Sequence, residues 1–114
     1  MTFEQYEIWL ADLNPRIGTE AGKVRPVLVV QTNLLNCIPH SSVLICPITT
    51  NVVRSAVYLR VHLEAGTSSL SKDCDIMIDQ IRAIDARRLI RLLGKIPAKS
   101  IKEVSDNLRI IMDL

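Results

Sequence analysis

Two apolar runs in the sequence each meet a polar side chain at one end. Arg25 and Pro26 open the run at residues 27–31, and the run at residues 43–48 ends at Thr49. Functional groups often sit where a rigid strand gives way to a loop. An arginine presents fixed N–H donors that suit a phosphate group, and a threonine presents a hydroxyl. The two positions therefore indicate a candidate site for chemistry on a phosphate.

A long loop, predicted at residues 14–24, leads into the strand that Arg25 opens. It contains two glycines and the charged side chains of Arg16, Glu20 and Lys23. A loop of this length in a small protein is often functional. The residues by themselves are equally consistent with a plain flexible connection between two strands.

Each candidate also has an ordinary structural interpretation. Thr49 could bond to local backbone at a strand end, and Arg25 could be the solvated flank of a strand. Gln80 and Arg82 could form the polar face of a half-buried strand. The two histidines have no evident partners, and we expect His62 to be a structural side chain on a strand face and His40 to be solvated.

The composition indicates an ordinary globular protein. The chain has 114 residues, of which 48% are hydrophobic and 23% charged, so we expect a single domain spanning 1–114. Nine of its fourteen basic residues are arginines, yet the net charge is only +2. That mild bias does not by itself imply a nucleic-acid partner.

The cysteines and the hydropathy pattern bear on metal binding, secretion and membrane association. The three cysteines form no C-x-x-C pair, and we expect Cys46, inside an apolar run, to pack as a small hydrophobe. Neither they nor the histidines have the spacing of a metal site. Free thiols suit a reducing cytosol. The N-terminus lacks the features of a signal peptide. No apolar stretch approaches the roughly 20 residues that span a bilayer. We therefore expect a cytoplasmic protein with no membrane association.

Hydrophobic periodicity predicts a mainly β protein with a C-terminal helix. We expect strands at 7–13, 25–31, 43–48, 57–63 and 75–85, a helical turn at 32–36, and a strand rather than a helix at 87–96. Pro47 predicts a bulge or an edge near the end of its strand. The helix stripe is formed by Ile101, Val104, Leu108, Ile111 and Met112. Ser100 and Glu103 match a capping box, although a start near Pro97 fits equally well.

Four stretches of the chain resemble the MazF/PemK-like toxins of bacterial toxin–antitoxin modules. Residues 8–15 are similar to the opening strand and turn of that family. Residues 18–31 are similar to its G-x-E-x-G-x-x-R-P-x-x-V core, 47–49 to its P-I-T motif, and 79–89 to its third motif. The core at residues 18–31 is the first motif, and it is specific in combination with the third motif at 79–89. The match runs nearly from end to end of the chain.

The resemblance implies a fold, an activity and partners. The fold would be α+β, a small barrel-like antiparallel sheet (PemK/CcdB-like, SH3-like) with a C-terminal helix. The activity would be that of a sequence-specific endoribonuclease that needs no metal or other cofactor, cleaves single-stranded RNA as a homodimer, and is neutralised by a cognate antitoxin. Arg25 and Thr49 fall on the family's catalytic positions, and Glu20 is a further candidate. The expected RNA contacts are Arg16, Lys23, Asn36, Asn51, Gln80 and Arg82.

Elementary chemistry agrees with this activity but does not identify the general base. RNA carries its own nucleophile, the 2′-OH, so the protein has to align oxygens and stabilise charge on the phosphate. Arg25 suits charge stabilisation but holds its proton too tightly to act as a base. Glu20 is a possible base. The alternative is a non-catalytic module of the same fold that binds DNA gyrase.

Overall fold

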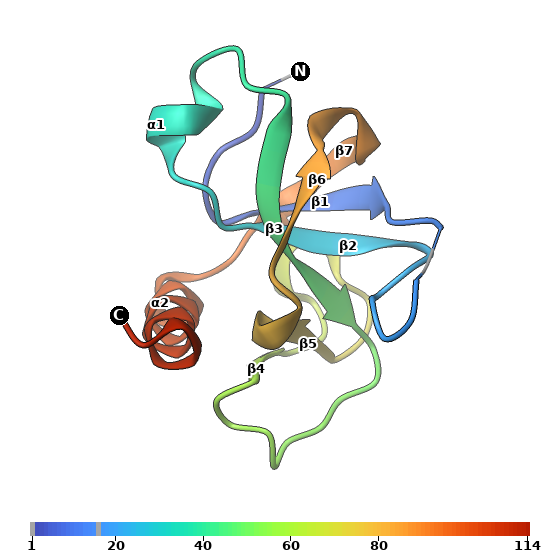
Figure 1. Cartoon of the computed structure of the whole chain (residues 1–114). Helices are drawn as coiled ribbons and strands as arrows, with labels where there is room; N and C mark the ends of the chain where they lie inside the picture. Colours follow the sequence, from blue (N-terminus) through green and yellow to red (C-terminus); the bar gives the residue numbers. More distant parts are fainter. Residues whose placement is uncertain (1, 16) are drawn as a thin grey trace.

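β3 (Ser42–Thr49) is the central strand of an antiparallel sheet in this computed structural model, which describes residues 2–15 and 17–114 (Figure 1). Arg16, one of the expected RNA contacts, lies outside the described residues. In the described part of the chain the sheet has seven strands in the order β4-β5-β3-β2-β1-β7, with β6 also paired to β3. The other strands are β1 (Glu7–Asp12), β2 (Val24–Val29), β4 (Arg60–Leu63), β5 (Cys74–Met77), β6 (Arg82–Asp85) and β7 (Leu89–Lys95).

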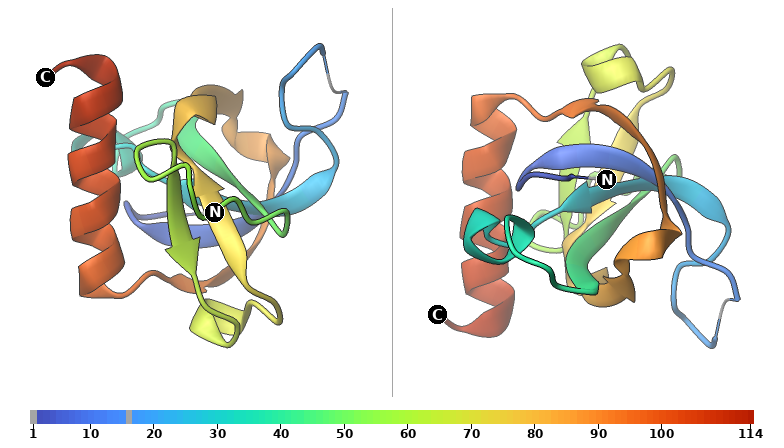
Figure 2. Two further views of the ribbon diagram at one scale, coloured as in Figure 1. Left: turned by 90° about the horizontal axis from the view of Figure 1, so that it is seen from below. Right: turned by 90° about the horizontal axis from the view of Figure 1, so that it is seen from above.

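The expected α+β class is confirmed. The sheet is bent but open, so it is barrel-like in a loose sense, and α2 (Ala98–Met112) stands along one side of it (Figure 2). The short helix α1 (Asn33–Asn36) and three 3-10 turns, η1 (Thr67–Ser69), η2 (Ile78–Gln80) and η3 (Ala86–Arg88), connect the strands. The region 87–96 is a strand from Leu89 onward, as Gly94 and Pro97 predicted.

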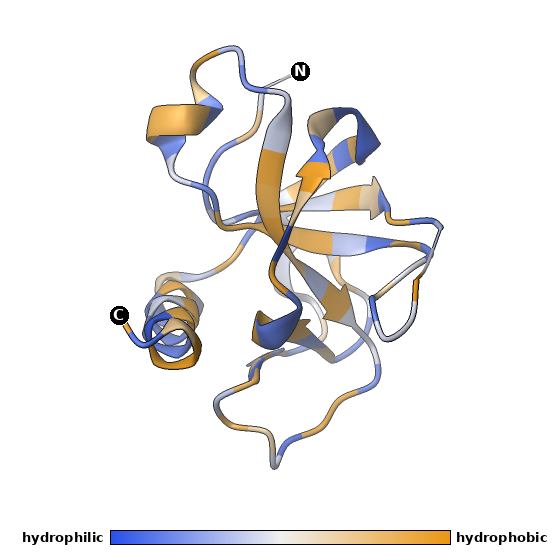
Figure 3. Cartoon of the chain, in the orientation of Figure 1, coloured by the Kyte–Doolittle hydropathy of each residue, from blue (hydrophilic) through white to orange (hydrophobic). Residues whose placement is uncertain are grey.

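Two hydrophobic cores lie on the two faces of the sheet, because successive side chains of a strand point to opposite faces. Leu28, Cys46 and Ile48 contribute to the core that packs against α2, whereas Val27 and Ile45 belong to the other core. Figure 3 shows the apolar residues concentrated along β2 and β3. The expectation that Cys46 packs as a small hydrophobe is confirmed, since it is fully buried and burial raises the pKa of its thiol to about 12.

The helix prediction was right about four residues of the stripe and wrong about the fifth. Val104 is fully buried in the first core, and Ile101, Leu108 and Ile111 pack against it. Met112, however, is exposed at the last helical residue. Of the two expected helix starts, the one near Pro97 is confirmed, because the helix begins at Ala98, and the capping box of Ser100 and Glu103 is not formed.

Two predicted strands are shortened by turns. The strand expected at 57–63 begins only at Arg60, because residues 56–60 form a hydrogen-bonded turn in which Arg60 N–H donates to the Ala56 carbonyl. The strand expected at 75–85 is divided into β5 and β6 by η2. Both halves pair antiparallel with the same side of β3, and η2 lies between them where that pairing is interrupted.

Pro47 marks an irregularity in the pairing on one side of β3 and not an outer edge of the sheet. β3 pairs with β2 on one side throughout residues 45–47. On its other side β3 pairs with β6 up to Ile45 and with β5 from Ile48 onward. Pro47 therefore lies in the gap between these two partners, where the missing N–H of proline removes no ladder hydrogen bond.

None of the helices in the described residues is long and apolar enough to cross a membrane.

Candidate active site

β2 and β3 carry the two candidate catalytic residues at the same end of the sheet. Val27 of β2 pairs with Pro47 of β3. Arg25 lies two residues beyond that pair on β2, and Thr49 lies two residues beyond it on β3, where it pairs with Asp75 of β5. The sequence placed both residues at strand ends, and the antiparallel pairing of β2 with β3 puts those two strand ends at the same end of the sheet.

Arg25 is held by the loop that precedes it. Its Nε donates to the carbonyl oxygen of Gly22 at 2.8 Å, and Gly22 is buried. A hydrogen bond at Nε fixes the plane of the guanidinium group and hence the direction of its remaining N–H donors. The side chain is half-buried at the edge of a cavity of about 180 Å³. This cavity is lined by Thr19, Glu20, Ala21, Gly22, Lys23, Arg25, Met77 and Gln80.

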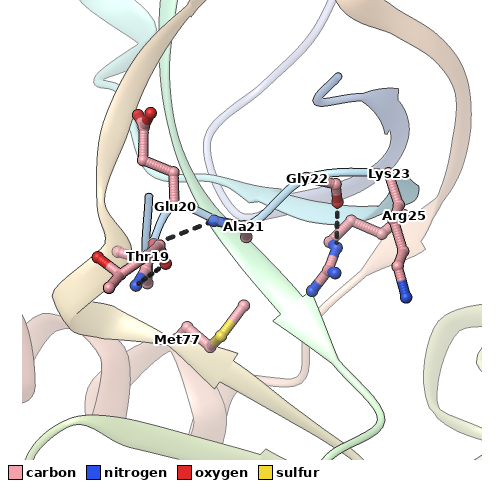
Figure 4. A pocket seen from close by; sticks show the side chains of 8 residues that line it. Thr19, Glu20, Ala21, Gly22, Lys23, Arg25 and Met77 are labelled. Atoms are coloured by element: carbon pink, nitrogen blue, oxygen red, sulfur yellow. Dashed lines mark hydrogen bonds between the residues drawn. The ribbon is translucent and has the colours of Figure 1, made fainter. Parts of the chain in front are cut away.

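The two cationic side chains of this cavity point in one direction, and its carboxylate points in another. In Figure 4 the charged ends of Arg25 and Lys23 point the same way, whereas the Glu20 carboxylate points away from them. Glu20 faces Arg82 instead, with 3.7 Å between Oε2 and a guanidinium nitrogen. The negative charge of Glu20 is therefore compensated by Arg82, and Lys23 and Arg25 form a cationic surface that suits an anionic phosphate.

Gln80 bonds to the loop through both ends of its amide. Its Oε1 accepts from the Ala21 N–H and its Nε2 donates to the Thr19 carbonyl, both at 3.3 Å. The structure thus brings Gln80 and Arg82 of the third motif against the loop of the first motif.

Thr49 makes the local bond that its ordinary structural interpretation predicted. Its Oγ1 accepts from the N–H of Asn51 at 3.1 Å, and the residue is half-buried at the end of β3. The hydroxyl keeps its own proton for donation while it accepts this bond. Thr49 therefore still has one hydroxyl proton that it can donate to a hydrogen bond.

The two asparagines do not join the cavity. The Asn36 side chain accepts from Gln31 Nε2 at 3.0 Å and donates to the Gln31 carbonyl at 2.9 Å, which ties α1 to the end of β2. Asn51 is exposed, and its carbonyl accepts from Arg60. Their roles as RNA contacts stay predictions.

Asp75 is a buried charge that the sequence analysis did not single out. Only 1% of it is exposed, and its carboxylate accepts from the Val53 N–H at 2.8 Å. The same carboxylate lies 3.2 Å from both Arg60 and His62. These bonds hold the loop that follows Thr49, and they make His62 the structural side chain that was expected. The available signal was one aspartate followed by three apolar residues in an expected strand.

We expect Asp75→Ala to lower the free energy of unfolding by about 3 kcal/mol, because it leaves the Val53 N–H and the half-buried side chains of Arg60 and His62 without their acceptor. Urea denaturation measures this change. Asp106→Ala is the matched control, since Asp106 forms an exposed i,i+4 pair with Lys102 on α2 and should cost less than about 0.5 kcal/mol. A loss below about 1 kcal/mol for Asp75→Ala would contradict the role of this network.

Within residues 2–15 and 17–114, no group of three or more His, Cys, Asp and Glu side chains is arranged to hold a metal ion.

Comparison with known families identifies the family of the chain. The family model of the PemK-like, MazF-like toxin of type II toxin–antitoxin systems matches residues 4–112. The chain belongs to this family. Endoribonuclease MazF9 of Mycobacterium tuberculosis is 34% identical over 113 residues, which cover 95% of this chain and 94% of that protein. Endoribonuclease MazF of Staphylococcus saprophyticus is 32% identical over 108 residues, covering 95% and 89%.

Solved structures share the fold of this PemK/MazF-family chain. MazF from Deinococcus radiodurans superposes with a TM-score of 0.84 at 23% identity, covering 100% of this chain and 99% of that one. An endoribonuclease in complex with its cognate antitoxin, from a mycobacterial species, gives a TM-score of 0.80 at 16% identity, covering 99% and 97%. At these identities the likeness establishes the fold alone.

Proposed function

We propose that the chain is a sequence-specific endoribonuclease toxin that cleaves single-stranded RNA, including mRNA, in the cytoplasm and so stops translation and growth. The observation that carries the proposal is a full-length match to proteins named as endoribonucleases, at 32–34% identity. The cavity beside Arg25, with its two cationic side chains, supports this proposal. The alternative of a non-catalytic module that binds DNA gyrase is not favoured, because these relatives are enzymes by name.

In the proposed reaction the substrate supplies its own nucleophile. The 2′-oxygen attacks the adjacent phosphorus, the bond from phosphorus to the 5′-oxygen breaks, and the products are a 2′,3′-cyclic phosphate and a 5′-OH. Arg25 stabilises the charge that develops on the phosphate oxygens and donates a proton to the leaving 5′-oxygen. Thr49 donates a hydrogen bond to the same phosphate and aligns it.

Glu20 is the proposed acceptor of the 2′ proton, and the observed geometry adds a condition to that role. Its carboxylate faces Arg82 at 3.7 Å and points away from Arg25. A general base has to lie within hydrogen-bond reach of the proton that it removes, and such contacts often form only with substrate bound. Glu20 would therefore have to change rotamer when RNA enters.

The direct test is incubation of the purified protein with a mixed pool of single-stranded RNA, followed by sequencing of the newly formed 5′ ends. We expect cuts at one short sequence. Arg25→Ala protein serves as the control for contaminating nucleases. An intact RNA pool after incubation with folded wild-type protein would refute the proposed activity.

RNA is proposed to lie in a groove shared by the two subunits of a homodimer. Lys23 and Arg25 would contact the backbone, while Arg16, Asn36, Asn51 and Arg82 stay candidate contacts. Gln80, the remaining expected contact, bonds to the loop beside Arg25. Several large apolar side chains are exposed in this chain, among them Val57 at 63% and Tyr58 at 60%. A symmetric interface would remove apolar surface of this kind from water. Light scattering at micromolar concentration should give twice the 12.8 kDa mass of one chain, and a monomer would contradict this.

We also propose a cognate antitoxin, with a flexible acidic segment that competes with RNA. A surface that holds phosphates with Lys23 and Arg25 also holds carboxylates. We expect an antitoxin fragment to displace a fluorescent, uncleavable 2′-deoxy RNA analogue, and added salt to weaken its electrostatic contribution. Fluorescence anisotropy measures the displacement. Unchanged RNA affinity at saturating antitoxin would show that inhibition acts at a distance.

A further inference from the structure

The tip of the loop beside Arg25 is held from the far side of the cavity. Residues 19–23 of this loop are called the Arg25 loop below. The base of the loop is fixed by the Lys23 N–H, which donates to Asn14 Oδ1 at 2.9 Å, and by the Leu13 N–H, which donates to the Lys23 carbonyl. Gln80 holds the tip through the two 3.3 Å bonds of its amide to Thr19 and Ala21.

The backbone that carries Gln80 is rigid. η2 is flanked by β5 and β6, which both pair with the central strand β3. Within η2 the Ile78 side chain is fully buried, and the Ile81 N–H donates to the Ile78 carbonyl. The excursion at η2 thus projects Gln80 from the centre of the sheet toward a loop 59–61 residues away in the sequence.

The Arg25 loop has a conformation that needs such support. Lys23 has a φ of +69°, in the left-handed region, which costs a residue with a side chain about 1 kcal/mol. Strained backbone persists only where surrounding contacts over-determine it. The loop passes directly from Ala21, which Gln80 holds, to Gly22, whose carbonyl fixes Arg25 Nε at 2.8 Å.

We propose that Gln80 is a positioning residue for Arg25, acting through Ala21 and Gly22 rather than by contact with RNA. Each end of its amide makes one hydrogen bond to the Arg25 loop, so the two bonds together fix the direction of the amide relative to Thr19 and Ala21. The ion pair of Glu20 with Arg82, from the same third motif, adds a weaker second link. The kinetic part of this inference rests on the proposed function, whereas the structural part does not.

The test compares Gln80→Leu and Gln80→Glu with a matched control, Gln5→Leu. Leucine removes both bonds at similar volume, and glutamate keeps the acceptor for Ala21 N–H while losing the donor to Thr19. Gln5 also donates from Nε2 to a backbone carbonyl, that of Val30 at 3.0 Å, but it does not line the cavity of Arg25. The measurements are kcat and KM on a cleavable RNA, Kd for an uncleavable 2′-deoxy analogue, and NMR hydrogen exchange of the Ala21 amide.

We expect Gln80→Leu to lower kcat about 10- to 100-fold while KM and the analogue Kd stay within about threefold, because misplaced catalytic groups lose rate rather than binding. Ala21 exchange should become at least about tenfold faster. Gln80→Glu should fall between Gln80→Leu and wild type, and Gln5→Leu should change none of these values.

Two results would overturn the inference: unchanged Ala21 exchange in Gln80→Leu, or a weaker analogue Kd with unchanged kcat, which would indicate direct RNA contact. If the wild-type protein cleaves no RNA, the proposed function fails, and Ala21 exchange still decides whether Gln80 holds the loop.

Discussion

Arg25→Ala should reduce RNA cleavage by about 10³-fold while leaving the protein folded. The side chain belongs to the second residue of β2, at the edge of the cavity, and its Nε donates to the Gly22 carbonyl at 2.8 Å, which fixes the direction of the guanidinium group. Preorganised donors aimed at a phosphate in its transition state are worth about 10² to 10³ or more in rate. Quantified cleavage of a defined oligonucleotide measures the effect, and circular dichroism with thermal unfolding verifies the fold.

The control variants separate charge, geometry and catalysis. Arg109→Ala removes an exposed arginine from α2 and should cleave like wild type. Arg25→Lys keeps the charge but loses the planar donor pair, so it should recover only a small part of the rate. Thr49→Ala should also be severely impaired, and Thr49→Ser should recover activity because it keeps the hydroxyl. Near-normal cleavage by folded Arg25→Ala protein would refute the assignment of the site.

Removing one oxygen from the substrate should abolish cleavage altogether. A substrate with a single 2′-deoxy nucleotide on the 5′ side of the cut lacks the proposed nucleophile, so we expect its cleavage at that bond to fall by at least about 10³-fold. The same oligonucleotide with 2′-deoxy substitution two positions away is the control and should be cut normally. Electrophoresis with mass spectrometry measures the products, which should end in a 2′,3′-cyclic phosphate and begin with a 5′-OH.

The family resemblance also predicts that this cleavage continues in excess EDTA. Activity that is lost in EDTA and restored by Mg²⁺ or Mn²⁺ would indicate a different nuclease mechanism, as would cleavage of the deoxy-substituted bond. Because these outcomes concern the chemistry alone, they can fail while the Arg25→Ala prediction holds.

Local sequence patterns were sufficient to predict several of the helices and strands. The stripe from Ile101 to Ile111 predicted α2 because a helix repeats every 3.6 residues, and the apolar runs predicted β2 and β3. The polar residues at the ends of those runs, together with the motif around Arg25, predicted the candidate catalytic pair. The same reasoning failed at Val57 to Leu59, whose alternation suggests a strand, because a turn bonded at Ala56 replaces it.

The sequence by itself thus determined the family, the fold class and the positions of Arg25 and Thr49, because these follow from motifs and short-range periodicity. The tertiary structure alone decided how those positions are supported. It directs Glu20 toward Arg82, turns Gln80 onto a loop 59–61 residues away, and makes Asp75 the acceptor for the segment after Thr49. Contacts across such separations leave no local pattern, because they arise only when the strands pair and bring distant polar groups within hydrogen-bond reach.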